Sequence, residues 1–255
     1  MGVSSGEAFP NMNPILEKIL NTQKVEAKDG STLPVHSCVP DREGKFLYQL
    51  VERVRPKESI EIGLGYGISS LYICEALKKN FPEAHHLILD PYQSEHWKGI
   101  GLENLKRAGY ENLIEFREAF SHLMLPHLVA QNKKVDFAFV DGAHTFDYAF
   151  LDFFYLDLLL KVGGILAFDD ADFPSVKKIC RYLLSNRHYR LIGYSEKTLT
   201  LKEKIKFALK KMRSVPPEYV WEELRGTWAR LPDARIMAFV KEGDDDKNWD
   251  FHREF

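Results

Sequence analysis

Apolar runs of strand length alternate with helical patterns from about residue 44 onward, and this alternation constrains the fold more than any other feature of the chain. Several runs are almost continuously apolar, which is typical of parallel strands covered by helices on both faces. The expected strands read SIEIG, HHLILD, LIEFRE, VDFAFVD and GGILAFDD, and the helices between them are expected at about residues 68–80, 97–108, 122–131 and 146–160. The pattern predicts a doubly wound α/β domain with a mostly parallel sheet.

Two more strands, YRLIGY and RIMAFVKEG, follow a helix expected at about 174–186 and bring the predicted sheet to seven strands. Between them, residues 197–232 carry apolar residues at helical spacing among many lysines. We interpret this insertion as an amphipathic surface helix with a solvated basic face, with a lid near a substrate as the alternative. The predicted organisation is an extension of residues 1–40, followed by a single domain of residues 41–255 that contains the insertion.

The composition favours a small molecule as the partner. The 35 basic and 37 acidic side chains leave a formal charge of −2, so neither nucleic acid nor an anionic membrane is an expected partner. The most apolar window, residues 149–168, is interrupted by charged residues and two glycines, which argues against a membrane span. The three cysteines fit no metal-binding spacing and are expected to be free thiols. We therefore expect a cytoplasmic protein.

A glycine-rich turn, EIGLGYG, follows the first expected strand and places glycines at positions 63, 65 and 67. A dinucleotide-binding turn would place its third glycine at Ile68, which disfavours an NAD-linked oxidoreductase. Glycines let a ligand approach the main chain, and the second strand ends in Asp90, whose carboxylate can accept hydrogen bonds from both hydroxyls of a ribose. The turn thus indicates a nucleoside-containing ligand; a plain strand-to-helix turn, with the aspartate in an ordinary loop, is the alternative.

Acidic residues also follow the next two expected strands. Asp141 ends one, and Asp169 and Asp170 end the other, so neighbouring parallel strands would bring them together at the edge where open α/β sheets bind ligands. Three carboxylates close together repel one another unless a cation lies among them, and oxygen-only ligands favour a hard ion such as Mg²⁺. The alternative is that they cap the following helices. His144 is a candidate base, or else an ordinary loop histidine.

The order ExGxGxG, helix, strand, Asp resembles class I S-adenosylmethionine-dependent methyltransferases. The resemblance implies that the glycine turn lies against the methionine part of the cofactor and that Asp90 holds its ribose. In that family the segment after the third strand contacts adenine, and Ser121 and His122 are the nearest candidates here. The cofactor-binding candidates are Glu61, Gly63, Gly65, Gly67, Asp90, Ser121, His122 and Asp141.

A narrower resemblance covers residues from about 41 to 194. The segments REGKFLYQLVERVRPKESIEIGLGYGISSL and DFAFVDGAHTFDYAFLDFFYLDLLLKVGGILAFDD are similar to the cation-dependent O-methyltransferases of the catechol and caffeoyl-CoA type, and closer to a bacterial branch with a DGxH motif. The catechol type holds its metal with an Asp and an Asp-Asn pair and uses a lysine base. Asp141 and Asp169 match this pattern, Asp170 replaces the Asn, and His144 replaces the lysine. A histidine exchanges protons near neutral pH, so the base chemistry is preserved.

These features predict an S-adenosylmethionine-dependent O-methyltransferase that uses a divalent cation to methylate a hydroxyl of a small molecule. The alternatives are a metal-independent methyltransferase of the same fold and a non-catalytic nucleotide-binding or scaffold protein. The helix at 146–160 carries Asp147, Asp152 and Asp157 at intervals that form no single polar stripe, so it must be covered on more than one side. The rest of the domain or the second subunit of a homodimer could supply that cover.

Overall fold

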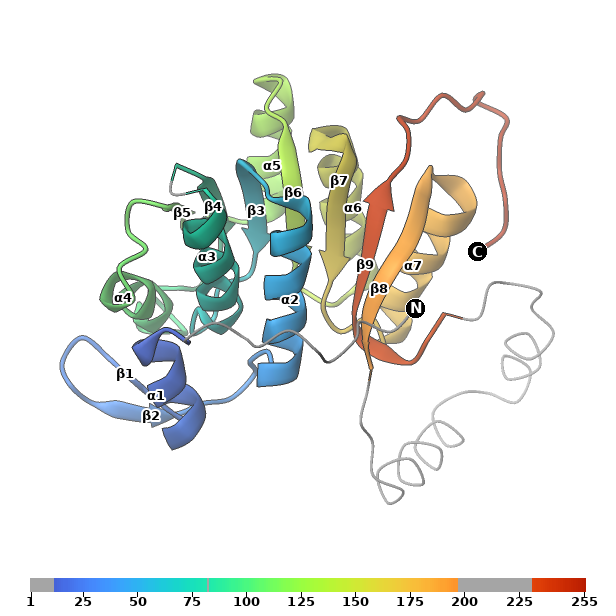
Figure 1. Ribbon diagram of the computed structural model, residues 1–255. Helices are drawn as coiled ribbons and strands as arrows, with labels where there is room; N and C mark the ends of the chain where they lie inside the picture. The colour runs from blue at the N-terminus through green and yellow to red at the C-terminus, as the bar shows by residue number, and fades with distance from the viewer. Residues whose placement is uncertain (1–11, 82, 197–230) are drawn as a thin grey trace, which may run out of the picture.

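A seven-stranded sheet forms the centre of the computed structural model, which describes residues 12–81, 83–196 and 231–255 (Figure 1). The strands lie in the order β5-β4-β3-β6-β7-β9-β8. Their bounds are β3 Glu58–Ile62, β4 His85–Leu89, β5 Ile114–Arg117, β6 Val135–Val140, β7 Leu160–Phe168, β8 Tyr189–Glu196 and β9 Ala234–Lys241. Strands β3 to β7 pair in parallel, whereas β9 runs antiparallel to both β7 and β8. The predicted doubly wound, mostly parallel sheet is confirmed.

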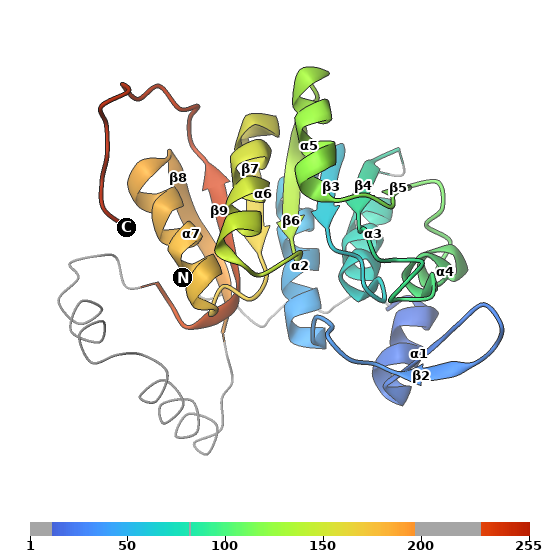
Figure 2. The same ribbon diagram turned by 180° about the vertical axis from the view of Figure 1, so that it is seen from behind.

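Helices cover both faces of the sheet. The helices are α2 Asp41–Val54, α3 Ile68–Asn80, α4 Ile100–Arg107, α5 Ser121–Ala130, α6 Phe146–Leu159 and α7 Pro174–Asn186. Helices α2, α3 and α4 lie on the face seen in Figure 1, and α5, α6 and α7 lie on the face seen in Figure 2. Alternate residues of β6 enter the two cores: Phe137 and Phe139 pack with the first set of helices, and Ala138 and Val140 pack with the second. This arrangement explains why several of the strands are mostly apolar on both faces.

Two element boundaries differ from the sequence prediction, and the first has a local reason. Helix α4 begins at Ile100 rather than near residue 97, because Lys98 and Gly99 adopt left-handed backbone conformations with φ of 53° and 67°. A right-handed helix cannot include such residues. Strand β7 begins at Leu160, directly after α6, whereas the expected strand began at Gly163.

The described part of the N-terminal extension consists of α1 Pro14–Thr22 and a hairpin of β1 Lys24–Glu26 and β2 Thr32–Pro34. Its apolar residues Leu16, Ile19 and Val25 are buried in the same core as α2, α3 and α4. The insertion at residues 197–232 lies outside the described residues apart from its last two positions, and so does the surface helix expected within it. In the described part of the chain, no helix combines the length and apolarity needed to cross a membrane.

Main-chain hydrogen bonds continue one residue beyond the central strands. The amide of Gly63 donates to the carbonyl of Leu89 at 2.8 Å, and the amide of Asp141 donates to the carbonyl of Ile62 at 2.8 Å. On the next strand, the amide of Asp169 donates to Val140 at 2.9 Å. The residues that follow the strands are therefore fixed by the sheet itself rather than by flexible loops.

A buried carboxylate joins the strand before the glycine turn to the helix after it. Glu61 is fully buried, and it accepts hydrogen bonds from the hydroxyls of Ser69 and Ser70 in the first turn of α3. It also contacts Nε2 of the buried His86 at 3.0 Å. The first turn of α3 contains no acidic residue of its own, so Glu61 supplies the negative charge that a helix N-terminus favours.

Gly63 is required where the turn passes the main chain of Asp141. Its φ is +92°, and a Cβ atom added there would lie 2.0 Å from the carbonyl oxygen of Asp141. Backbone atoms cannot yield as a flexible side chain can, so any larger residue must push the two strand ends apart. By contrast, Gly99 shares a positive φ of +67°, but no described atom lies within 4 Å of its Cβ position.

Replacing Gly63 and Gly99 separately by alanine will separate the two costs. We expect Gly63→Ala to lower the free energy of unfolding by about 3 kcal/mol or more, because backbone strain and steric overlap add. Gly99→Ala should cost about 1 kcal/mol, since it meets the backbone strain alone. Urea unfolding followed by circular dichroism measures both values, and equal losses would contradict the close approach.

Candidate active site

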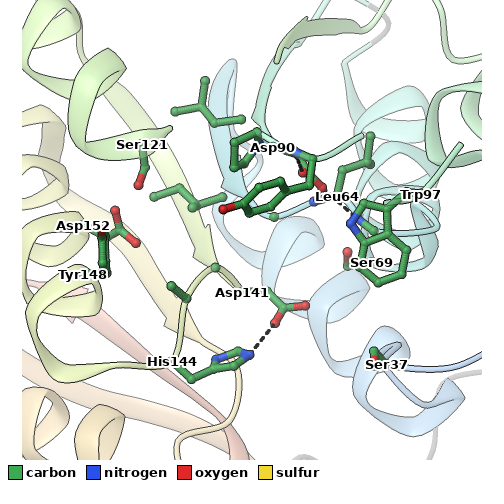
Figure 3. Close-up of a pocket in the computed structure, with 18 of the residues that line it drawn as sticks. Ser37, Leu64, Ser69, Asp90, Trp97, Ser121, Asp141, His144, Tyr148 and Asp152 are labelled. Atoms are coloured by element: carbon green, nitrogen blue, oxygen red, sulfur yellow. Dashed lines mark hydrogen bonds and ion pairs between the residues drawn. The ribbon is translucent and has the colours of Figure 1, made fainter. Parts of the chain in front are cut away.

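A cavity of about 390 Å³ opens at the carboxyl edge of the sheet, where the ends of β3, β4 and β6 meet (Figure 3). Its wall is built from the glycine turn, the segments after these strands, and the starts of α5 and α6. The polar lining residues include Ser37, Ser69, Asp90, Ser121, His122, Asp141, His144, Tyr148 and Asp152. This is the edge at which the acidic strand ends were predicted to converge.

Asp90 fastens the glycine turn to the second strand. Its Oδ2 accepts hydrogen bonds from the amides of Leu64 and Gly65, each at 3.0 Å. Its Oδ1 accepts one hydrogen bond, from the amide of Tyr92 at 2.8 Å. A carboxylate oxygen can accept two hydrogen bonds, so Oδ1 keeps capacity for a ligand that enters the cavity.

The cavity gathers most of the candidates from the sequence, but not all of them. Its wall includes Gly63, Gly65, Asp90, Ser121, His122, Asp141 and His144. Glu61 lies behind the turn in its buried network. Gly67 is instead the N-cap of α3 and faces Gly101. A Cβ atom added at Gly67 would lie 3.0 Å from the carbonyl oxygen of Gly101. Glu61 and Gly67 shape the turn rather than line the cavity, and Asp169 and Asp170 also lie outside the cavity lining.

His144 stands between two acidic residues. Its Nε2 lies 3.3 Å from Oδ2 of Asp170 and 4.0 Å from Oδ1 of Asp141. The main-chain carbonyl of His144 accepts a hydrogen bond from the hydroxyl of Ser175 in α7, which holds the loop in place. A histidine in this position can accept a proton in the cavity while a carboxylate steadies the charged ring.

The carboxylates next to His144 outnumber the positively charged groups that lie close to them. Burial raises the pKa of Asp141 well above its ordinary value, and the charges of Asp169 and Asp170 raise it further. Burial and the charge of Asp170 raise the pKa of Asp169 to about 7. Oδ1 of Asp169 is buried and has no hydrogen-bond partner among the described residues. An arrangement of this kind favours a cation.

One guanidinium group already lies in this cluster. Nη2 of Arg235 is 3.2 Å from Oδ1 of Asp170 and 3.8 Å from Oδ2 of Asp169, and its Nε is 3.7 Å from Oε2 of Glu43. As the side chains lie, no three His, Cys, Asp or Glu residues of the described chain are grouped so that they could hold a metal ion. The predicted donors are brought together, but they do not form a finished metal centre.

Sequence reasoning missed two residues of the site. Asp152 of α6 is 1% exposed and lines the cavity, and its Oδ1 has no hydrogen-bond partner in the described chain. Burial raises its pKa to about 6, against a hydrogen bond from Ser121 that lowers it. An acid within the apolar sequence of α6 was a usable signal. Arg235 gave no such signal, since its partners come from α2 and the end of β7.

Aromatic rings surround the end of the cavity near Ser121. Phe120 contacts Tyr92 and His122, with ring centroids 5.7 Å and 5.3 Å apart, and His122 contacts Tyr148 at 5.3 Å. Nδ1 of His122 is buried without a hydrogen-bond partner among the described residues. A planar ligand with polar edges suits these surroundings.

Comparisons with known proteins agree with this geometry. Residues 60–171 match a family described as a methyltransferase domain. The tapetum-specific methyltransferase 1 of Arabidopsis thaliana is 35% identical over 133 residues, which cover 52% of this chain and 54% of the relative. The caffeoyl-CoA O-methyltransferase 1 of the same plant is 33% identical over 131 residues, covering 50% and 48%. The chain thus spans about half the length of the curated relatives it matches.

Solved structures extend the likeness to almost the whole chain. The O-methyltransferase TomG from Streptomyces achromogenes, solved in complex with S-adenosylmethionine, superposes with a TM-score of 0.62 over 91% of this chain and 92% of that protein, at 17% identity. At that identity the likeness establishes the fold. Residues 60–171 are therefore similar to a methyltransferase domain, and the curated relatives that the chain matches over about half of its length include O-methyltransferases of the caffeoyl-CoA type.

Proposed function

We propose that this protein is an S-adenosylmethionine-dependent O-methyltransferase that methylates a hydroxyl group of a small molecule. The observation that carries the proposal is the cavity shared by the glycine turn, Asp90, Asp141 and His144. One wall has the features of a nucleoside site, and the other offers a base beside acidic residues. Cofactor and acceptor therefore meet within one enclosed space, as transfer between them requires.

In this proposal, the ribose would lie at Asp90, and one of its hydroxyls would donate to Oδ1, which has one acceptor position left. The methionine part follows the glycine turn, where Gly63 and Gly65 present main chain rather than side chains. The ribose and the methionine part would then both contact residues that follow the neighbouring strands β3 and β4. The cofactor supplies a methyl group on a sulfonium sulfur, and its transfer leaves S-adenosylhomocysteine.

The adenine lies at the aromatic end of the cavity. Its exocyclic amino group donates to Asp152, which satisfies the unpartnered Oδ1, and the ring stacks among Phe120, His122 and Tyr148. Unpartnered polar atoms in a buried site cost free energy until a ligand pairs with them. Ser121 contributes through its hydrogen bond to Asp152.

His144 acts as the general base. It accepts the proton of the acceptor hydroxyl at Nε2, and the acceptor oxygen forms its bond to the methyl carbon as the carbon–sulfur bond breaks. Asp170, at 3.3 Å from Nε2, stabilises the charged ring. Holding the acceptor oxygen close to and in line with the methyl group supplies much of the acceleration.

A divalent cation, Mg²⁺ by its preference for oxygen, is part of the proposal, with Asp141, Asp169 and Asp170 as its holders. The residues fit such an ion in chemistry, because all donors are oxygens and one buried oxygen of Asp169 is unpartnered among the described residues. When bound there, the ion would lower the pKa of an acceptor hydroxyl. A metal-independent methyltransferase is the second candidate, and the guanidinium of Arg235 beside the same carboxylates favours it.

The proposal also covers the class of acceptor, the assembly and the location of the protein. Caffeoyl-CoA and the flavonoids named for the plant relatives carry phenolic hydroxyls, and we propose acceptors of this class. The half-exposed apolar side chains of α6, among them Leu151, Phe154 and Leu158, support a homodimer through this helix. The three free cysteines support a reducing, cytoplasmic location.

Asp90→Asn will weaken binding of S-adenosylhomocysteine by roughly tenfold or more, because the amide NH2 that takes the place of Oδ1 cannot accept a hydrogen bond from a ribose hydroxyl. Its amide oxygen still accepts from the glycine turn, so the fold should persist. Isothermal titration calorimetry measures the affinity, with Asp29→Asn in the exposed hairpin as the matched control. Equal affinity in Asp90→Asn and the wild type would remove the ribose contact from the account.

His144→Ala will lower kcat by about a hundredfold or more on any accepted phenol, because the acceptor loses its base. The KM for S-adenosylmethionine should stay near the wild-type value. The assay follows transfer of a radiolabelled methyl group to caffeoyl-CoA and to a panel of flavonoids. His188→Ala, which alters an exposed histidine paired with Asp246, is the control. An unchanged kcat would exclude His144 as the base.

Dialysis against EDTA will abolish methyl transfer, and added Mg²⁺ will restore it, if the cation takes part as proposed. Binding of S-adenosylhomocysteine should persist in EDTA, since its contacts lie on the other wall of the cavity. Full activity after removal of divalent ions would instead support the metal-independent candidate.

A further inference from the structure

Arg235 is fixed among acidic residues from two different parts of the chain. It stands near the start of β9, and its carbonyl accepts a hydrogen bond from the amide of Ala171 at 2.7 Å, which ties its backbone to the end of β7. Its side chain contacts Asp170 and Asp169 beyond β7 and Glu43 of α2. The side chain is 31% exposed, whereas Asp169 is only 3% exposed. The guanidinium therefore covers a buried carboxylate from the solvent side.

The charges show what this arginine does there. Burial lowers the pKa of Arg235, but the charges of Asp169, Glu43 and Asp170 outweigh burial and raise the pKa above its ordinary value. Reciprocally, the charge of Arg235 counteracts the raised pKa values of Asp141, Asp169 and Glu43. Arg235 is thus the principal countercharge of the acidic cluster as described.

A divalent ion at the same carboxylates would meet this charge directly. The guanidinium uses acceptor positions on Asp170 and lies close to Asp169, and like charges at such separations repel. Arginine stays protonated at all ordinary pH values, so it cannot yield by losing its proton. It can yield only by moving away.

We propose that Arg235 is a tethered competitor of the divalent cation, neutralising Asp169 and Asp170 until a metal ion displaces it. The inference rests on the cation of the proposed function and gives it a mechanism of control. It explains why the predicted donors converge but are not grouped as a metal centre in the described part of the chain. Metal binding and the contacts of Arg235 with Asp169 and Asp170 then exclude each other.

Titration with Mn²⁺ tests this competition without any assay of activity. Free Mn²⁺ is measured by electron paramagnetic resonance in the wild type, Arg235→Met, Arg235→Lys and Arg190→Met. We expect Arg235→Met to lower the Kd for Mn²⁺ roughly tenfold, and Arg235→Lys, which keeps the charge, to stay near the wild type. Arg190 is an exposed arginine of β8 that pairs with Glu242, and Arg190→Met should leave the Kd for Mn²⁺ unchanged.

The outcomes separate the inference from the proposed function. Equal Kd values in the wild type and Arg235→Met would overturn the competition while leaving the metal site in place. No Mn²⁺ binding in either protein would overturn both. Adding Asp169→Asn to Arg235→Met should abolish the gain, and a retained gain would show that the ion binds elsewhere.

A second measurement uses the wild-type protein, in case Arg235→Met does not fold. Phenylglyoxal modifies accessible arginines, and mass spectrometry reports the modified fraction at Arg235. Mn²⁺ should increase modification of Arg235 severalfold, because the displaced guanidinium loses its carboxylate contacts, while modification of Arg190 stays constant. Unchanged modification of Arg235 at a saturating Mn²⁺ concentration would contradict displacement.

Discussion

The close passage of Gly63 across the main chain of Asp141 is the constraint on which the site depends. A Cβ atom at Gly63 would lie 2.0 Å from the Asp141 carbonyl oxygen, so the turn and the acidic loop are as near as backbones can be. Hydrogen bonds from Gly63 to Leu89 and from Asp141 to Ile62 extend the sheet through this point. The glycine turn and the acidic side of the cavity are thereby positioned by one rigid contact.

The buried carboxylates around that contact differ in how many hydrogen-bond partners the chain gives them. Glu61 and Asp90 are provided with hydrogen-bond donors by the chain itself, and they shape the turn. Asp152 and Asp169 each keep a buried oxygen without a partner in the described residues, and both have raised pKa values because of burial. Glu61 acts in the fold alone, whereas ligands are expected at Asp90, whose Oδ1 keeps acceptor capacity, and at Asp152 and Asp169, whose buried oxygens lack partners among the described residues.

The sequence predicts the sheet and its carboxyl edge well, because both depend on local patterns. The apolar runs and the residues that end them suffice to place Asp90, Asp141 and Asp169 at the ends of strands in one sheet. The start of α4 was missed, since the left-handed backbone at Lys98 is not evident from its side chain. Arg235 was missed because its role depends on contacts with α2 and the end of β7. The roles of the candidate residues, and the narrower likeness to a bacterial branch with a DGxH motif, stay predictions.

A crystal structure of the protein with S-adenosylhomocysteine tests the central claim most directly. The account predicts the ligand in the cavity at the ends of β3, β4 and β6, with its ribose at Asp90, its adenine beside Ser121 and Asp152, and its sulfur on the side of His144. An empty cavity at a saturating ligand concentration, or a ligand whose sulfur lies away from His144, would contradict it.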